Sequence, residues 1–168
     1  MPRAISTDFR DAVEASRSSE VIVIFATITH ASLAEPVRVN SDVVDYEYNG
    51  DLYSGAAFAL TLLTDDEQPP RAQVSIHNVD QAIGRAVQAL SSSPAILIEI
   101  MVKSDFDDSD PRAAIGTPVV EYSAPGLLLQ NVKCDVLTMS ADIVGYDLTT
   151  EPWPSIRSTP ERLPGLSR

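Results

Sequence analysis

The stretch DYEYNGDLY, residues 45–53, carries the strongest local structural signal in the chain. Its centre, Asn49-Gly50, tolerates the positive φ values of a type I′ turn, and tyrosine alternates with acidic residues beside it. This pattern is typical of two short antiparallel strands joined by two residues. The sequence therefore predicts a tight hairpin here and favours an antiparallel β protein around it.

Apolar runs on both sides of the hairpin predict further strands. Residues 20–31, EVIVIFATITHA, are dense in β-branched side chains, as a central strand covered on both faces would be. Residues 72–78 alternate with period two around Val74 and Ile76. Further strands are predicted over residues 55–63, 94–103, 127–137 with a break near Asn131, and 140–148. Pro36 makes residues 33–40 a partly irregular edge.

Two short helices complete the predicted domain. Residues 6–18 place Phe9 and Val13 on one face, with Ser6 or Thr7 as the cap, and this helix leans on the rest of the domain. Residues 81–90 repeat apolar side chains at helical spacing. The predicted class is α+β, mostly antiparallel β, a β-sandwich or barrel over residues 1–150. Residues 151–168 hold four of the 12 prolines without periodicity, and predict an extended C-terminal arm.

Composition excludes several classes of function. Acidic residues outnumber basic ones 24 to 12, and the resulting net charge of -12 repels nucleic-acid phosphates and anionic lipid surfaces. One cysteine, Cys134, excludes a disulfide framework and a multi-thiolate metal site. Its position in an apolar predicted strand indicates a buried, inert thiol. The apolar runs are too short to span a bilayer, so no membrane partner is expected.

The search for catalytic chemistry yields little. The two histidines, His30 and His77, lie in predicted strands and carry no metal-ligand spacing. The acidic run at residues 105–110 has oxygens at alternate positions, but Asp110 and Gly116 stand where a calcium loop requires Gly and a bidentate acid. No catalytic, cofactor or metal site is therefore predicted, and the chain is not expected to be an enzyme.

Aromatic residues are the better candidates for contact with a partner. Tyr46, Tyr48 and Tyr53 form a cluster that cross-strand packing or an interface would explain. Trp153 lies between prolines in a segment with no core of its own, so its ring must bury against this chain or a neighbour. The predicted interface comprises Tyr46, Tyr48, Tyr53, Trp153, Pro154, Ile156, Leu163 and Leu166.

Three stretches together resemble a known family. They are residues 39–62 around the hairpin, residues 71–102 with RAQVSIHNVDQAIGRAVQAL and AILIEIMV, and residues 147–166, DLTTEPWPSIRSTPERLPGL. The chain resembles small siphophage tail-module proteins of unassigned biochemical function, and its front part is similar to the N-terminal half of the lambda minor tail protein at the tail-tip hub. That relative is longer and bears cysteines in its C-terminal part, so no iron–sulfur centre carries over.

The resemblance implies a structural role in the tip of a phage tail. It implies a ring around the tail axis, threefold or sixfold, with the distal tail, central hub and tape measure proteins as partners. A tail-assembly chaperone absent from the virion is one alternative. A cell-wall-degrading or sugar-binding module is another, for which Glu99, Glu121 and the 105–110 run are the only candidate carboxylates.

Overall fold

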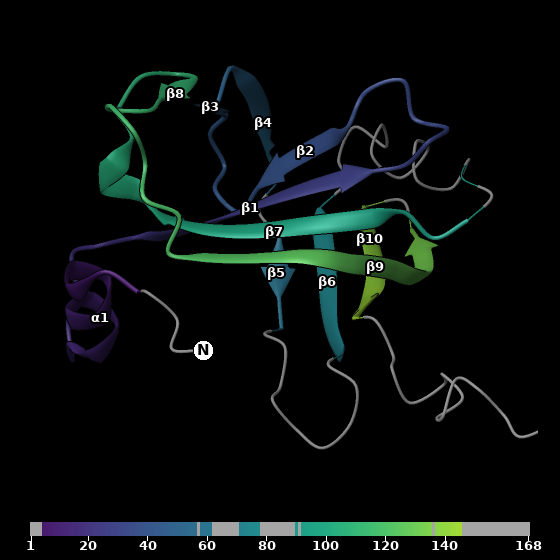
Figure 1. Ribbon diagram of the computed structural model, residues 1–168, viewed down its shortest axis with the longest axis horizontal. Helices are drawn as coiled ribbons and strands as arrows, with labels where there is room; N and C mark the ends of the chain where they lie inside the picture. The colour runs from purple at the N-terminus through teal and green to yellow at the C-terminus, as the bar shows by residue number, and fades with distance from the viewer. Residues whose placement is uncertain are drawn as a thin grey trace, which may run out of the picture.

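The computed structural model describes residues 5–56, 58–61, 71–77, 90, 92–135 and 137–145. These residues form a short helix, a 3₁₀ turn and ten strands in the order β5-β6-β10-β9-β7-β1-β2-β4-β3-β8 (Figure 1). The elements are α1 (Thr7–Glu14), β1 (Ile22–Thr29), β2 (Val37–Asn40), β3 (Tyr46–Tyr48), β4 (Asp51–Gly55), β5 (Ala59–Leu60), β6 (Arg71–His77), β7 (Ala95–Val102), η1 (Lys103–Asp105), β8 (Arg112–Ala113), β9 (Tyr122–Cys134) and β10 (Thr138–Val144). The α+β, mainly β class is confirmed.

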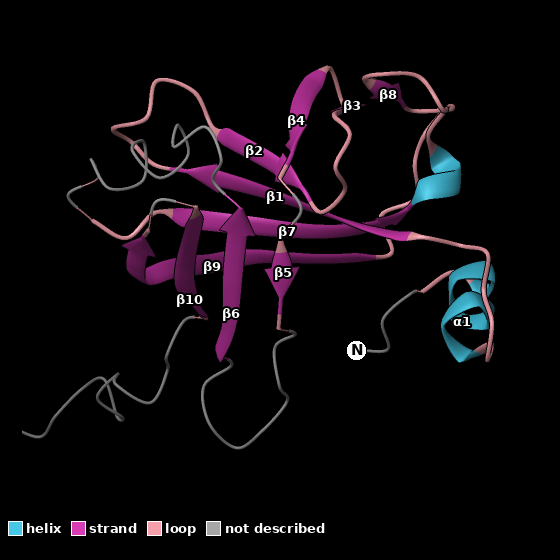
Figure 2. Ribbon diagram, turned by 180° about the vertical axis from the view of Figure 1, so that it is seen from behind, coloured by secondary structure: helices cyan, strands magenta, loops and turns pink. Residues whose placement is uncertain are grey.

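Strand β9 bends the sheet into two limbs. Its first half pairs with β7, from Tyr122 opposite Ile100 to Leu128 opposite Ala95, and its second half pairs with β10. Gly126, at φ 76°, and Asn131, at φ 51°, accompany the two shifts in register, and such bulges let a strand turn a corner. Figure 2 shows β6 and β10 running steeply across β1 and β7.

The bent sheet differs from the predicted sandwich or barrel. We call β1, β2, β7 and the first half of β9 the first limb, and the second half of β9 with β10, β6 and β5 the second limb. The order of the described strands runs open from β5 to β8, so a closed barrel is wrong. Two layers do face each other, but they are the limbs of one continuous sheet rather than two separate sheets.

The main core lies between the two limbs. The first limb contributes Ala26 and Ile28 from β1 and Ile96 from β7, all fully buried. The second limb contributes the inward side chains of β6 and β10, which alternate with exposed residues in β6, as its period-two pattern predicts, and mostly with half-buried residues in β10. These inward residues are Ala72, Val74, Ile76, Met139, Ala141 and Ile143.

Strand β1 is buried on both of its faces, as the sequence predicts. Ala26 and Ile28 face the main core, while Val23 and Phe25 belong to a second cluster on the outer side of the first limb. The β3–β4 hairpin covers that outer side. Its turn is the predicted one, with Asn49 at φ 55° and Gly50 at φ 80°, and Tyr46 stands opposite Tyr53.

Two strand predictions are wrong, one in its place within the sheet and one in its continuity. The segment predicted as an edge contains β2, which pairs with β1 on one side and with β4 on the other, because Pro36 stands just before the strand where its missing N–H breaks no ladder. The strand predicted over residues 55–63 is interrupted: Gly55 ends β4, and of the residues described in this stretch Ala59–Leu60 form the next strand, β5, which pairs with β6 in the other limb.

Other boundaries differ more modestly. Helix α1 ends at Glu14 instead of residue 18, because the serines that follow favour local turns; the Ser18 hydroxyl accepts the Glu20 N–H at 3.0 Å. Strand β9 begins at Tyr122, five residues before the predicted start. Strands β6 and β7 agree with the prediction to within a residue. The predicted helix at 81–90, except Leu90, and the arm at 151–168 lie outside the described residues.

Candidate functional site

The three tyrosines of the predicted interface lie in the interior of their own chain. Tyr46, Tyr48 and Tyr53 pack around Phe25, whose ring centroid is 5.5, 5.9 and 5.1 Å from theirs. All three are buried, so the interface assigned to them is wrong and the cross-strand packing alternative is confirmed. Alternating aromatic residues look the same in sequence whether a sheet or a partner covers them.

The hydroxyl groups of Tyr46 and Tyr53 have partners inside the chain. Tyr46 donates to Asp42 Oδ2 at 2.9 Å, and the Tyr53 hydroxyl lies 3.1 Å from Thr27 Oγ1. Burial, then the hydrogen bond with Asp42, raises the pKa of Tyr46 well above its usual range. The cluster is therefore a structural core with satisfied polar ends rather than a platform open to a ligand.

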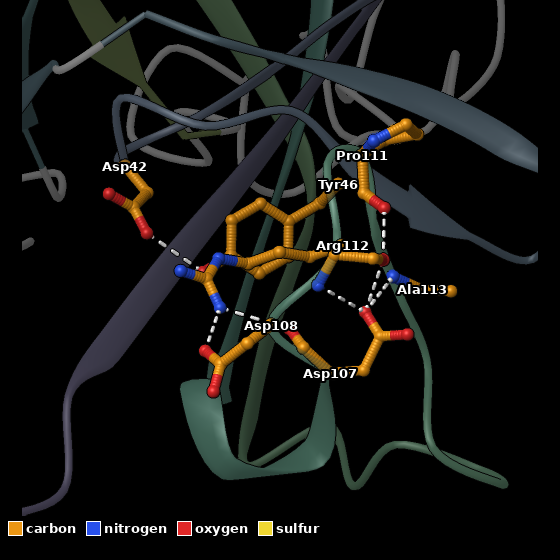
Figure 3. Close-up of polar contacts among 8 residues, drawn as sticks. Asp42, Tyr46, Asp107, Asp108, Pro111, Arg112 and Ala113 are labelled. Carbon is orange, nitrogen blue, oxygen red and sulfur yellow. Dashed lines mark hydrogen bonds and ion pairs between the residues drawn. The ribbon is translucent and has the colours of Figure 1, made fainter.

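The acidic loop after β7 is organised by its own carboxylates (Figure 3). Asp107 Oδ1 accepts the backbone N–H groups of Ser109 at 3.1 Å and Ala113 at 2.8 Å. Arg112 Nη1 donates to the Asp107 carbonyl at 2.9 Å and forms an ion pair with Asp108. The pKa of Asp107 is lowered, mainly by its hydrogen bond from the Ser109 side chain. The pKa of Asp108 is lowered, mainly by its hydrogen bond from Arg112.

This loop is joined to the aromatic core. The Arg112 guanidinium carbon lies 5.9 Å from the centroid of the Tyr46 ring, a cation–π distance, and the Arg112 backbone N–H donates to the Asp45 carbonyl. Asp105 Oδ2 accepts the Val119 N–H at 3.0 Å. The carboxylates at the start of the acidic run thus accept hydrogen bonds from backbone N–H groups. The described residues contain no cluster of side chains suited to a metal ion.

The two glutamates that sequence offered as catalytic candidates have different surroundings. Glu121 is buried, and its Oε2 accepts the Ser6 N–H at 2.8 Å, which ties the cap of α1 to the sheet. Glu99 lies on β7, opposite Phe25 on one side and Ser123 on the other. Burial raises the pKa of Glu99. Glu121 is therefore an anchor, and Glu99 is a half-buried acid that the fold tolerates.

Replacing Glu99 by glutamine should stabilise the protein at neutral pH. Because the folded-state pKa of Glu99 is raised, its ionised form is disfavoured in the folded state, and the wild type gains stability as pH falls through that pKa. Glu99→Gln should therefore unfold at higher urea concentration than wild type at pH 7, with the difference vanishing below about pH 4. Glu47→Gln, at an exposed site on β3, is the control; a less stable Glu99→Gln protein at pH 7 would contradict this account.

A serine–histidine pair that the sequence did not indicate has the hydrogen bonding of a structural contact rather than of a catalytic pair. His30 Nε2 lies 2.7 Å from Ser92 Oγ, which is the distance of a nucleophile and its general base. However, His30 Nδ1 accepts the Ser32 N–H at 3.0 Å, so the neutral ring carries its proton on Nε2 and donates it to Ser92. The hydrogen bond between His30 and Ser92 joins two loops, and in this arrangement His30 cannot accept the proton of the Ser92 hydroxyl. His77 is exposed on β6, and Cys134 is half-buried against the main core.

Apolar side chains are exposed where β1 begins and β7 ends. Helix α1 lies beside this end of the sheet, with Val13 59% exposed (Figures 1 and 2). Val21, which accepts the Lys103 N–H at 2.8 Å, is 50% exposed, and Val119 is 52% exposed. Together with Ile5 and Ile22 we call these residues the apolar end. No single run in the sequence marks it, because its members come from three separate segments.

The remaining predicted interface residues, Trp153, Pro154, Ile156, Leu163 and Leu166, lie outside the described residues. Among the helices in the described part of the chain, none has the length and apolar character needed to cross a membrane. A family model described as a domain of unknown function, DUF1833, matches residues 8–158. No curated protein matches the chain.

Proposed function

Since this chain belongs to the DUF1833 family, whose function is unknown, we propose its role from the residues themselves: a non-enzymatic structural protein of a phage tail tip. In this role it is synthesised in the bacterial cytoplasm and becomes part of the virion, as a hub or distal-tail ring that joins the tail tube to the tip complex. The family resemblance of residues 39–62, 71–102 and 147–166 supports the proposal. A homotrimer is favoured, with a hexamer as the alternative.

The apolar end is the observation that carries the proposal. Monomeric proteins rarely leave several large aliphatic side chains uncovered in one region, and such regions mark protein contacts. Val13 and Val119 come from different segments, and the proposal requires that a neighbouring subunit covers both. The net charge of -12 keeps the chain soluble until it meets those neighbours.

The proposed contact also suits a ring. In a closed ring each subunit presents one surface to its neighbour and a different one to the neighbour on its other side. Helix α1 meets its own sheet through the bond from Ser6 to Glu121, with Phe9 half-buried and Val13 left exposed for contact with another subunit. The described chemistry of His30 with Ser92 and of the acidic loop also favours a structural role over catalysis.

Charges introduced into the apolar end should prevent incorporation into tails. In a phage that encodes this chain, the double variant Val13→Asp with Val119→Asp should fold normally, because both side chains are exposed, yet be absent from purified virions analysed by mass spectrometry. Val43→Asp is the control, since Val43 is 78% exposed in the turn between β2 and β3. Normal incorporation of the double variant would refute the contact, and absence of the wild type from virions would favour an assembly chaperone.

A further inference from the structure

A polar groove lies on the outer face of the second limb. It comprises two adjoining hollows of about 450 and 190 Å³ that share Gln73, Asn131 and Asp142, one from each of β6, β9 and β10. Cross-strand pairing places Asp142 directly between Gln73 and Gln130, and places Ser140 between Ser75 and Lys133 in the next row. The small serine side chains leave space between the longer amide and lysine side chains.

The groove is held together by hydrogen bonds across its strands. Asp142 Oδ2 accepts from Asn131 Nδ2 at 2.7 Å, and Asp142 Oδ1 accepts from Gln73 Nε2 at 3.3 Å. Asn131 is the bulged residue of β9, with φ at 51°, a backbone conformation that asparagine tolerates better than most residues. Bulges frequently re-aim a side chain at a binding site, and here the bulge aims an amide at the central carboxylate.

The chemistry of the groove favours a ligand rich in hydroxyl groups. Each amide side chain offers two N–H donors and a carbonyl acceptor, and serine hydroxyls both donate and accept. Among the described residues, Gln73 and Asn131 each use one donor on Asp142. A ligand that fits must therefore present donors and acceptors at several neighbouring positions, as the hydroxyl groups of a sugar do.

Other ligand classes fit the groove less well. Phosphate and other anions meet the Asp142 carboxylate and a chain of net charge -12, against one cation, Lys133, among the lining residues that the structure describes. A hard metal ion needs several oxygen ligands, and within the described part of the lining Asp142 is the one carboxylate. Val144 gives only a small apolar area, enough for the C–H face of a sugar and too little for a protein helix, because the side chain of Ala72 in the same lining points into the main core.

We propose that this groove binds a neutral oligosaccharide, with Asp142 as the central acceptor and Gln73, Asn131 and Gln130 as its flanking amides. A volume of about 450 Å³ falls in the range of small-molecule sites. Binding through uncharged hydroxyl groups in an open groove is expected to be weak, in the millimolar to micromolar range. The inference rests on the groove alone and does not depend on the tail-tip role.

The test is a titration of the ¹⁵N-labelled full chain, followed by NMR, with maltotriose, cellotriose and chitotriose, and with sialyllactose as the charged probe. At least one neutral probe should produce saturable shifts at residues 73–75, 130–133 and 140–142, and sialyllactose should bind more weakly. Asp142→Asn should weaken binding about tenfold, the effect of losing a hydrogen bond to a charged group. Asn131→Gly should also weaken binding, and glycine keeps the φ of 51° without strain.

Glu47→Gln is the matched control, because it removes one negative charge at an exposed site in β3, outside the groove. It should leave the affinity unchanged, and thermal melts should show that all the variants are folded. The proposal is overturned if no neutral probe gives saturable shifts, if the shifts lie elsewhere, or if Asp142→Asn binds as wild type does. None of these results bears on incorporation into virions, so the groove proposal can be refuted while the tail-tip proposal stands, and the reverse also holds.

Discussion

Phe25→Ala is expected to lower the free energy of unfolding by about 3–5 kcal/mol, which is a large part of the stability of an ordinary domain. Phe25 is buried in the middle of β1, and its ring stacks on Phe106 at 5.6 Å and meets the edge of Tyr53 at 5.1 Å. The alanine variant would leave a cavity that rigid aromatic rings cannot easily fill. Urea unfolding monitored by tyrosine fluorescence measures the loss.

Leu52→Ala provides the comparison within the same hairpin. Leu52 is 53% exposed on β4, beside the buried Tyr53, so its truncation should change stability by no more than about 0.5 kcal/mol. If Phe25→Ala cost as little as Leu52→Ala, the hairpin would not be packed on the first limb, and the assignment of the tyrosines to the core would be wrong. The same result would restore them as candidates for a partner surface.

Gly55→Ala is expected to destabilise the protein by about 3 kcal/mol or more, at the upper end of overpacking effects. A Cβ atom at Gly55 would lie 2.6 Å from the Val43 carbonyl carbon and 2.7 Å from its oxygen. These are backbone atoms in the turn between β2 and β3, so no side-chain rotation relieves the contact. The Gly55 N–H also donates to Asp45 Oδ1 at 2.8 Å, and displacement of the strand would weaken that bond.

Gly126→Ala is the matched control for this prediction. Gly126 has a φ of 76°, and a Cβ there would meet nothing within 4 Å, so its substitution carries only the backbone cost of about 1–2 kcal/mol. Unfolding curves of the two variants separate close contact from backbone strain. Equal losses for the two would show that the chain at Gly55 moves away from Val43 without difficulty.

The interior of the fold was predictable wherever one strand carried its own pattern. Strand β1 reads as buried on both faces because apolar residues occupy odd and even positions alike, and both faces are indeed covered. Strand β6 alternates, and it buries one face. The turn at Asn49-Gly50 follows from backbone conformation within two residues. Each of these depends on neighbours in the chain.

The candidate sites were much less predictable. Tyr46 and Tyr48 share a face in any hairpin, but only the placement of that hairpin over Phe25 made the face a core. The break expected near Asn131 is a bulge, yet its importance depends on Asp142, eleven residues along the chain, and on Gln73, which lies much further away. A sequence pattern does not indicate which strands will lie side by side.

From the sequence alone, local features could be determined: the hairpin turn, the periods of β1 and β6, a cap of α1 at Ser6 or Thr7, and the acidic character of the chain. These depend on φ and ψ preferences and on side-chain period, which act over a few residues. The bend of β9, the burial of the tyrosines, the exposed apolar end and the polar groove became apparent only in the tertiary structure. Each of those depends on contacts between distant segments, whose free energies become known only when the strands are packed together.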